Sequence, residues 1–239
     1  MYRAPRNISY YLRVHCKTEN FVSTTCLKKL TMTFKLVFFV AVYLVHEISG
    51  HGYMLNPPGR SSMWRFHPEA TPNYQDNQIF CGGAYVQNEL NGELCGVCGD
   101  PYTDPHPQEN ENTGKYGQGI IAATYDAGSV IDVEIHLTAN HLGNFTYSLC
   151  QLEDPNAPEP GEYCFEDLLL EDGSANYNVV DEDEVVYNRV RLPGFQCPRC
   201  VLRWTYKAGN NFGQCEDGQW RRACGPQEHF RACADISIV

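Results

Sequence analysis

The sequence predicts an all-β fold, an antiparallel β-sandwich that carries long disulfide-pinned loops and a short helix. Three observations predict it. After Gly128 several short segments alternate apolar and polar residues, as strands with one buried face do. Before Gly128 the chain is crowded with Gly, Pro, Asn and Asp and has little periodicity, which is typical of loops. An even set of ten cysteines, spread from position 81 to 233, suits five disulfides that would hold such loops in place.

The strand-like segments are short and separated by turn residues, as in a sandwich. The clearest one reads SVIDVEIHLT, in which apolar and polar residues alternate. The region 51–125 is expected to form loops with one short helix, and the acidic stretch 153–183 a long connection with a hairpin or short helix. The expected strands are 129–138, 145–150, 184–192, 201–207 and 232–239.

Residues 1–50 have the features of a removable leader. Lys35 precedes an apolar run at 36–45, and the polar tail after it ends in Gly50, a small residue suited to signal-peptide cleavage. The run is about half of the roughly 20 residues that a membrane span requires. We therefore predict a secreted chain, with 1–31 an extra N-terminal stretch without a recognisable role, 1–50 removed, and 51–239 a single catalytic domain.

The charge of the expected mature chain narrows the possible partners. Residues 51–239 contain 11 basic and 27 acidic residues, a formal net charge of −16. Such a charge disfavours nucleic acid and anionic membranes, whereas it does not disfavour a neutral, insoluble polymer.

The cysteines allow two interpretations. The spacings CGVC at 95–98 and CPRC at 197–200 would suit a zinc ribbon, but a secreted chain favours disulfides. Spacing alone leaves the pairing open. One glycosylation acceptor sequence begins at Asn144. The cysteines of 51–239 are Cys81, Cys95, Cys98, Cys150, Cys164, Cys197, Cys200, Cys215, Cys224 and Cys233.

Cleavage after Gly50 would make His51 the first residue, with a free amine beside its own imidazole. That amine has a pKa of about 7.7–8.0, so it gives up its proton to a metal easily. His141, in TANH at the end of an expected strand, could add a third nitrogen, and a tetragonal set of nitrogen ligands favours Cu(II). His229 is the main competitor for the third ligand. The remaining histidines read as surface or structural groups: His67, His106 and His136.

The leading HGY segment, TANH and the C-terminal EHFRACADI together resemble the lytic polysaccharide monooxygenases, and the cysteine-rich layout is most similar to auxiliary activity family fifteen. The resemblance covers 51–239 and implies an immunoglobulin- or fibronectin III-like sandwich. It implies that His51 and His141 bind one copper ion per chain. Phe230 then matches the aromatic residue on one axial side of copper, and Ala139 a small residue on the other. Gln227 or Glu228 would orient the oxidant.

The same resemblance implies the reaction. Copper, reduced by an external electron donor, would use hydrogen peroxide or dioxygen to oxidise C1 or C4 of a sugar in crystalline chitin, with cellulose as a second substrate. A monomer suffices for a flat polymer surface. Tyr74 and Tyr116, in the loop region, are the candidates for stacking on sugar rings. The tryptophans are expected to be structural: Trp64, Trp204 and Trp220.

Three other functions fit parts of the sequence. A non-catalytic module on the same scaffold would bind chitin or carry copper without turnover. A cysteine-rich matrix protein would hold zinc. A glycosidase would use a pair of carboxylates, but no pair stands out among the many acidic residues.

Overall fold

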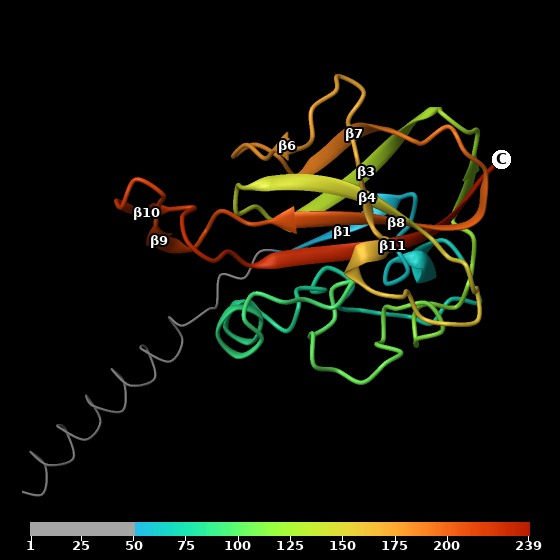
Figure 1. Ribbon diagram of the computed structural model, residues 1–239, viewed down its shortest axis with the longest axis horizontal. Coiled ribbons are helices and arrows are strands. Elements are labelled where there is room, and N and C mark those ends of the chain that lie inside the picture. The colour runs from blue at the N-terminus through green and yellow to red at the C-terminus, as the bar shows by residue number, and fades with distance from the viewer. Residues whose placement is uncertain (1–50) are drawn as a thin grey trace, which may run out of the picture. The chain divides into compact units, whose positions relative to one another are not determined.

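The structure, a computed structural model, describes residues 51–239, so the expectations for the extension and leader lie outside the described residues. Two antiparallel sheets stack as layers (Figure 1), which confirms the predicted sandwich. Three single turns of 3-10 or π helix interrupt the loops. The elements are β1 (His51–Asn56), η1 (Met63–Arg65), η2 (Val86–Leu90), β2 (Ala123–Tyr125), β3 (Val130–Ala139), β4 (Asn144–Gln151), η3 (Glu162–Cys164), β5 (Glu166–Leu168), β6 (Tyr177–Asn178), β7 (Val185–Arg191), β8 (Cys197–Lys207), β9 (Phe212–Gln214), β10 (Trp220–Arg222) and β11 (His229–Ile238).

The five predicted strands are confirmed as β3, β4, β7, β8 and β11, with ends that differ by up to four residues. β8 begins at Cys197 rather than 201, because its first four residues, CPRC, contain a proline and a charged residue and do not have the composition of a strand. The segment 51–56, expected as loop, is β1, an edge strand that pairs with β3. The loop region before β2 holds two helical turns, η1 and η2, where one short helix was expected.

The smaller sheet has the strand order β1-β3-β7 and the larger one β2-β11-β8-β4-β5, with β6 also paired to β4. In the larger sheet only the β2–β11 pair is parallel. Alternate residues of β3 and β7 point into the sandwich and meet the inward face of β11 in one hydrophobic core. No helix among residues 51–239 is long and apolar enough to cross a membrane.

All ten cysteines of the described chain form disulfides, which confirms the disulfide interpretation and contradicts the zinc one. The two residues of CPRC pair with each other, whereas those of CGVC join different partners. The Cys98–Cys233 bridge pins the loop region to the outer face of β11. The pairs are Cys81–Cys95, Cys98–Cys233, Cys150–Cys164, Cys197–Cys200 and Cys215–Cys224.

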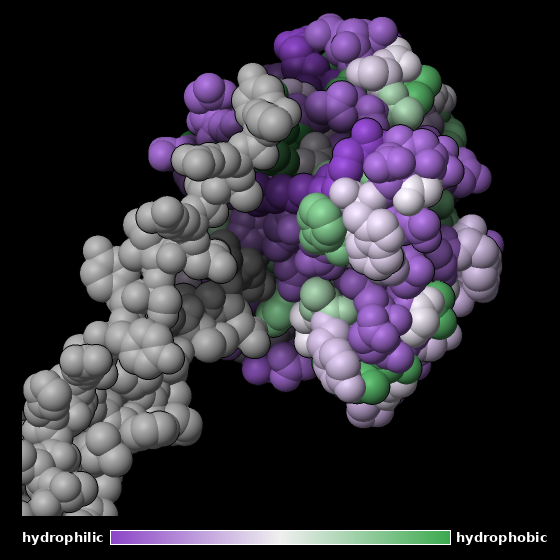
Figure 2. Space-filling model, turned by 90° about the vertical axis from the view of Figure 1, so that its left-hand side faces the viewer, coloured by the Kyte–Doolittle hydropathy of each residue, from purple (hydrophilic) through white to green (hydrophobic). Residues whose placement is uncertain are grey.

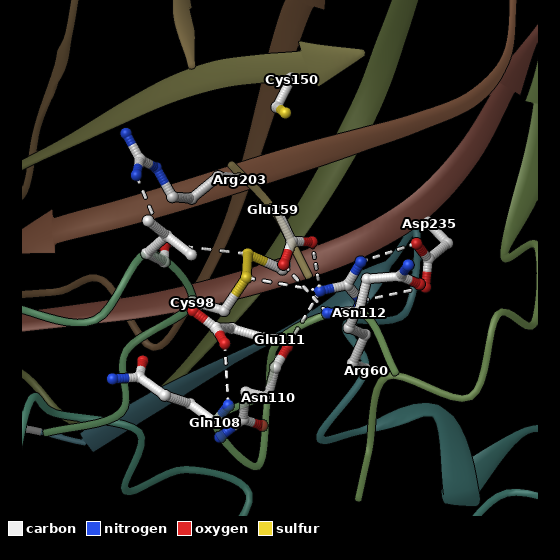
Figure 3. Close-up of polar contacts among 12 residues, drawn as sticks. Arg60, Cys98, Gln108, Asn110, Glu111, Asn112, Cys150, Glu159, Arg203 and Asp235 are labelled. Atoms are coloured by element: carbon white, nitrogen blue, oxygen red, sulfur yellow. Dashed lines mark hydrogen bonds and ion pairs between the residues drawn. A yellow bond between two sulfur atoms is a disulfide. The ribbon is translucent and has the colours of Figure 1, made fainter. Parts of the chain in front are cut away.

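A buried guanidinium joins the loops to the sandwich (Figure 3). Arg60 donates through Nε and Nη2 to Asp235 on β11, at 3.0 and 2.8 Å. Its Nη1 lies 2.7 Å from a Glu159 carboxylate oxygen and donates to the Asn110 carbonyl at 2.9 Å. The charges of Arg60, Asp235 and Glu159 are almost completely excluded from solvent, so each depends on the others.

We predict that Arg60→Met lowers the free energy of unfolding by about 3–5 kcal/mol, because it leaves Asp235 and Glu159 as buried, unpaired carboxylates. Denaturant unfolding would measure the change. The matched control is Arg189→Gln, which removes an exposed ion pair with Glu171 and should cost no more than about 1 kcal/mol. Equal stabilities of the two variants would contradict the role of Arg60.

Candidate metal centre

His51 opens β1 and lies opposite Ala139, the last residue of β3. A register shift follows His51 in this pair. Gly52 then donates its N–H to the Asn77 carbonyl at 3.1 Å, so β1 is joined to the loop region as well as to β3. A Cβ on Gly52 would stand 3.0 Å from the His136 carbonyl oxygen, so glycine permits this close approach. The first described residue is thereby fixed at the edge of the sandwich.

His141 lies in the tight turn between β3 and β4. Leu142 and Gly143 both have positive φ, and the Asn140 side-chain oxygen accepts the Leu142 N–H at 2.8 Å, an Asx turn. The Asn140 amide also donates to the carbonyls of Val180 and Asp183. A Cβ at Gly143 would overlap the Lys207 carbonyl oxygen, so this turn requires glycine. The turn brings the two histidines predicted from the sequence to the same end of the sandwich.

The backbone of His141 is held from both sides. Its N–H donates to the Tyr206 hydroxyl, and its carbonyl accepts the Gly209 N–H, both at 2.9 Å. The ring is 3 % exposed, yet neither Nδ1 nor Nε2 has a hydrogen-bond partner. Buried polar atoms are normally satisfied, and an imidazole with two orphaned nitrogens fits a metal ligand.

The electrostatics keep this imidazole neutral. Burial lowers the pKa of His141, and the charges of Arg222 and His51 lower it further. A neutral ring has a lone pair to offer a metal. Burial also raises the pKa of Tyr206 to about 12, against the lowering effect of the His141 N–H, so its hydroxyl stays protonated. The two imidazoles are donors that suit a copper ion.

Phe230 lies beneath this site. Its ring centroid is 6.5 Å from that of His51, and it packs against Phe80 at 6.0 Å and Tyr206 at 5.6 Å. Because Phe230 is completely buried and has no polar atom in its side chain, the sandwich side of the site is apolar. Ala139, opposite His51 in the strand pair, is a partly exposed neighbour on the other strand.

Gln227 and Glu228, the two candidates for orienting an oxidant, are both buried at the start of β11. The Gln227 amide is engaged elsewhere: its oxygen accepts the Asn211 N–H at 3.0 Å, and its nitrogen donates to the Cys224 carbonyl at 2.8 Å. It therefore holds the base of the β9–β10 hairpin. Glu228 precedes Phe230 by two residues, so it lies on the same side of the chain as Phe230, and its carbonyl accepts the Ala208 N–H at 3.0 Å.

His229, the competing candidate for a metal ligand, points away from this site. Along a strand successive side chains point to opposite faces, so His229 faces away from the side on which Phe230 meets His51. Burial lowers its pKa to about 4. His106 and His136 each contact a carboxylate, Glu111 and Glu134. Among residues 51–239 no group of three or more His, Cys, Asp or Glu side chains is arranged to hold a metal ion.

The two tyrosines chosen for sugar stacking differ. Tyr74 is 81 % exposed and rests edge-on against Trp64 at 5.2 Å, so its exposure is confirmed. Tyr116 is only 8 % exposed, and the expectation that it offers its ring at the surface is wrong. Its backbone N–H is bonded to the Glu109 carbonyl, and the Lys115 ammonium covers its ring at 4.7 Å.

The β9–β10 hairpin carries an aromatic pair that the sequence analysis missed. Trp204 is buried in the core as expected, but Trp220 is 63 % exposed and stacks on Phe212, itself 66 % exposed, at 6.4 Å. The expectation that Trp220 is structural is therefore wrong. The hairpin is closed by the Cys215–Cys224 disulfide and projects from the sandwich (Figure 1). A sequence signal was present, since Asp-Gly between two short segments is a hairpin turn.

Comparisons with known proteins find a matching family and a similar solved structure. The model of the family described as lytic polysaccharide mono-oxygenase, cellulose-degrading, matches residues 51–236. A solved AA15 lytic polysaccharide monooxygenase from Thermobia domestica, in the Cu(I) state, is 44 % identical with a TM-score of 0.75, and the alignment covers 79 % of this chain and 98 % of that one. No curated protein matches.

Two further solved structures are similar more remotely. A chitin binding domain from Burkholderia pseudomallei is 12 % identical, with a TM-score of 0.45 and coverage of 80 % and 100 % of the two chains. The cellulose-active monooxygenase CelS2 in complex with copper is 14 % identical, with a TM-score of 0.42 and coverage of 78 % and 98 %. At these TM-scores neither supports a conclusion.

We predict that Tyr206→Phe weakens Cu(II) binding by about ten-fold or more, because the His141 N–H loses its acceptor and the ring loses its fixed position. Calorimetric titration would measure the affinity. The control is Tyr147→Phe, which removes the hydrogen bond to Asn188. Both variants should lose about 1–3 kcal/mol of stability, so a loss of affinity in both, or in neither, would contradict the role of Tyr206.

Proposed function

The chain belongs to the lytic polysaccharide monooxygenase family, a family of copper-dependent oxidative enzymes, and we propose that it is secreted and cleaves crystalline chitin, with cellulose as a second substrate. One observation carries the proposal. The buried His141 imidazole has two unpartnered nitrogens and lies at the same end of the sandwich as His51. The family match also begins at His51, which supports cleavage after Gly50.

After that cleavage, the ligands would be the amine and imidazole of His51 and the imidazole of His141, for one ion per chain. Copper would supply one-electron redox chemistry: an external donor would reduce it, and hydrogen peroxide or dioxygen would be the oxidant for C1 or C4 of a sugar. The protein's part is to hold the ligands rigidly. Tyr206 and Gly209 fix the His141 backbone, and the β3 pairing fixes His51.

The residues around the ligands control access. Phe230 would present an apolar ring to the metal from the sandwich side, since its buried side chain has no oxygen atom to offer. Ala139, with only a methyl group, would leave room on the open side. Glu228, buried near Tyr206, remains our candidate for orienting the oxidant, whereas Gln227 would act only through the base of the hairpin.

The polymer would lie across the end of the sandwich that bears the ligands. Figure 2 looks at that side of the molecule, where the visible surface is mainly hydrophilic with small apolar patches. Two aromatic groups would contact sugar rings there, Tyr74 on its Trp64 support and the Phe212–Trp220 pair on the hairpin. Aromatic faces and polar groups together suit a neutral polysaccharide.

Two observations bear on the choice between chitin and cellulose, and they point to different polymers. The description of the family favours cellulose, whereas the likeness to auxiliary activity family fifteen favours chitin. The remaining expectations stay predictions: secretion, a monomeric state and a glycan at Asn144, which begins β4 and is partly exposed. The rival function is a module that binds chitin or carries copper without turnover, and only product analysis separates the two.

We predict that His51→Ala and His141→Ala each abolish stoichiometric copper binding and oxidised products. The chain would be secreted with its own leader, supplied with copper and ascorbate, and incubated with chitin and cellulose in parallel, with products measured by mass spectrometry. Reductant-dependent aldonic acids or C4-ketones are expected from the wild type only.

His136→Ala is the matched control, because His136 lies on β3 and its partner is Glu134. It should keep copper and activity. Wild-type protein that binds copper but yields no oxidised product from either polymer would establish the rival function. Unchanged activity in His51→Ala or His141→Ala would exclude the proposed ligands.

We predict that Trp220→Ala weakens binding to the crystalline polymer by about five-fold to ten-fold, the equivalent of about 1–1.4 kcal/mol for one lost aromatic contact. Pull-down isotherms on the insoluble polymer would measure it. The control is Tyr187→Ala, which removes an equally exposed aromatic ring from β7. Equal losses in both variants would show that the hairpin has no special role.

A further inference from the structure

Two positively charged side chains in the described chain differ from the others in that they contact no protein oxygen. The 11 basic residues of 51–239 include nine whose side chains contact a carboxylate or another protein oxygen. Within the described chain the side chains of Arg222 and Lys207, both exposed, have no hydrogen bond or ion pair. The nine engaged residues are Arg60, Arg65, Lys115, Arg189, Arg191, Arg199, Arg203, Arg221 and Arg231.

Both unpaired cations lie next to the His141 turn. Arg222 ends β10 opposite Phe212, and the next residue, Ala223, donates its N–H to the Asn211 carbonyl. Lys207 ends β8, two residues before Gly209, which donates its N–H to the His141 carbonyl. Lys207 also lies opposite Asn144, the first residue after the His141 turn, in the β4–β8 pair.

The orientation of the hairpin favours Arg222. Residues opposite each other in an antiparallel pair, and residues two apart on one strand, share a face. Arg222 therefore shares a face with Phe212 and Trp220, whereas Arg221 on the other face is paired with Asp217. Lys207 borders a cavity of about 470 Å³ together with Glu216 and Asp217, so part of its charge is offset.

This arrangement opposes the overall charge of the protein. The formal charge of −16 over residues 51–239 repels anions at long range. Within a screening length of about 8 Å, however, the nearest charges decide the local potential. An unpaired guanidinium beside the metal ligands thus provides a local attraction for an anion, on a molecule that otherwise disfavours one.

We propose that Arg222, supported by Lys207, is the docking site for a small anionic electron donor of the ene-diol or phenolate class. The inference rests on the proposed copper function. The docked donor would give one electron to Cu(II), which would become Cu(I), and would leave as its radical. An ene-diol monoanion would also release its remaining hydroxyl proton to solvent, whereas a phenolate has no such proton to release. Donor docking would precede the polymer, because the hairpin face that bears Arg222 also bears the aromatic pair.

Stopped-flow reduction of the copper-loaded, secreted protein tests the proposal. With ascorbate monoanion, Arg222→Gln should lower the second-order rate constant by about three-fold to ten-fold, and Lys207→Gln should lower it less. With hydroquinone, uncharged at mildly acidic pH, the rate constant should not change. Arg222→Lys keeps the charge and should restore most of the ascorbate rate.

The matched control is Arg189→Gln, which changes the net charge equally on β7, where Arg189 pairs with Glu171. Added salt should slow ascorbate reduction of the wild type and have a smaller or opposite effect on Arg222→Gln. Equal slowing in the Arg189 and Arg222 variants would overturn the proposal, as would equal slowing with hydroquinone.

A copper titration with electron paramagnetic resonance, made first, separates this proposal from the proposed function. Wild-type protein that binds no stoichiometric Cu(II) would overturn both. Protein that binds copper with an unchanged spectrum in Arg222→Gln, yet shows no change in the ascorbate rate constant, would overturn the docking site alone.

Discussion

The buried ion cluster around Arg60 is the constraint on which the functional end of the molecule depends. A sandwich of short strands has little to hold loops as long as 57–122, and backbone that is not paired in a sheet must find other partners. Arg60 supplies several at once, since it joins the loop after β1 to β11 through Asp235 and to the later connection through Glu159. The Cys98–Cys233 disulfide joins the same loops covalently to β11, and its Cys98 sulfur lies 3.5 Å from Arg60 Nη1. Desolvating three charges is costly, so the cluster specifies one arrangement of the loops more than it adds stability.

That arrangement extends to His51 and His141, the metal ligands that we propose. The loop residue Asn77 accepts the N–H of Gly52, and Ile79 accepts the N–H of Arg231, so one loop segment is bonded to both β1 and β11. His141 is reached from the other side, through Tyr206 on β8. Neither histidine therefore sits on a free loop, although both lie at element ends. Rigid placement of this kind is what a site needs when its ligands must keep their geometry while the oxidation state of the metal changes.

The parts of the fold that depend on a local residue pattern could be predicted from the sequence. The parts that depend on packing between distant segments could not. β3 could be predicted because one of its faces is buried and the other is largely exposed to solvent, so that apolar and polar residues alternate. The first residues of β8 could not be predicted, because CPRC lacks this alternation and contains a proline. The pairing of Arg60 with Asp235, 175 residues away, leaves no trace in either local sequence. His51 and His141 were found through processing and family resemblance rather than through spacing. Tyr116 and Trp220 were assigned the wrong exposure, because a loop aromatic is buried or exposed according to what the rest of the chain places over it.

The two flanks of the His141 turn differ in charge, and this difference follows from the topology. On one flank Asn140 is bonded to the backbone of Val180 and Asp183, in a turn where Asp181, Glu182 and Glu184 are exposed carboxylates. On the other flank Gly209 leads into the hairpin that bears Arg222. Both flanks are hydrogen-bonded to the turn itself, so the backbone that carries these charges keeps its position relative to His141. A small anion approaching from solvent is therefore repelled by the carboxylates on the Asn140 flank and attracted by Arg222 on the Gly209 flank. A neutral polymer is affected by neither charge. Charge would thus guide an anionic donor to the Arg222 flank before the polymer covers the same hairpin face, without requiring any part of the fold to move.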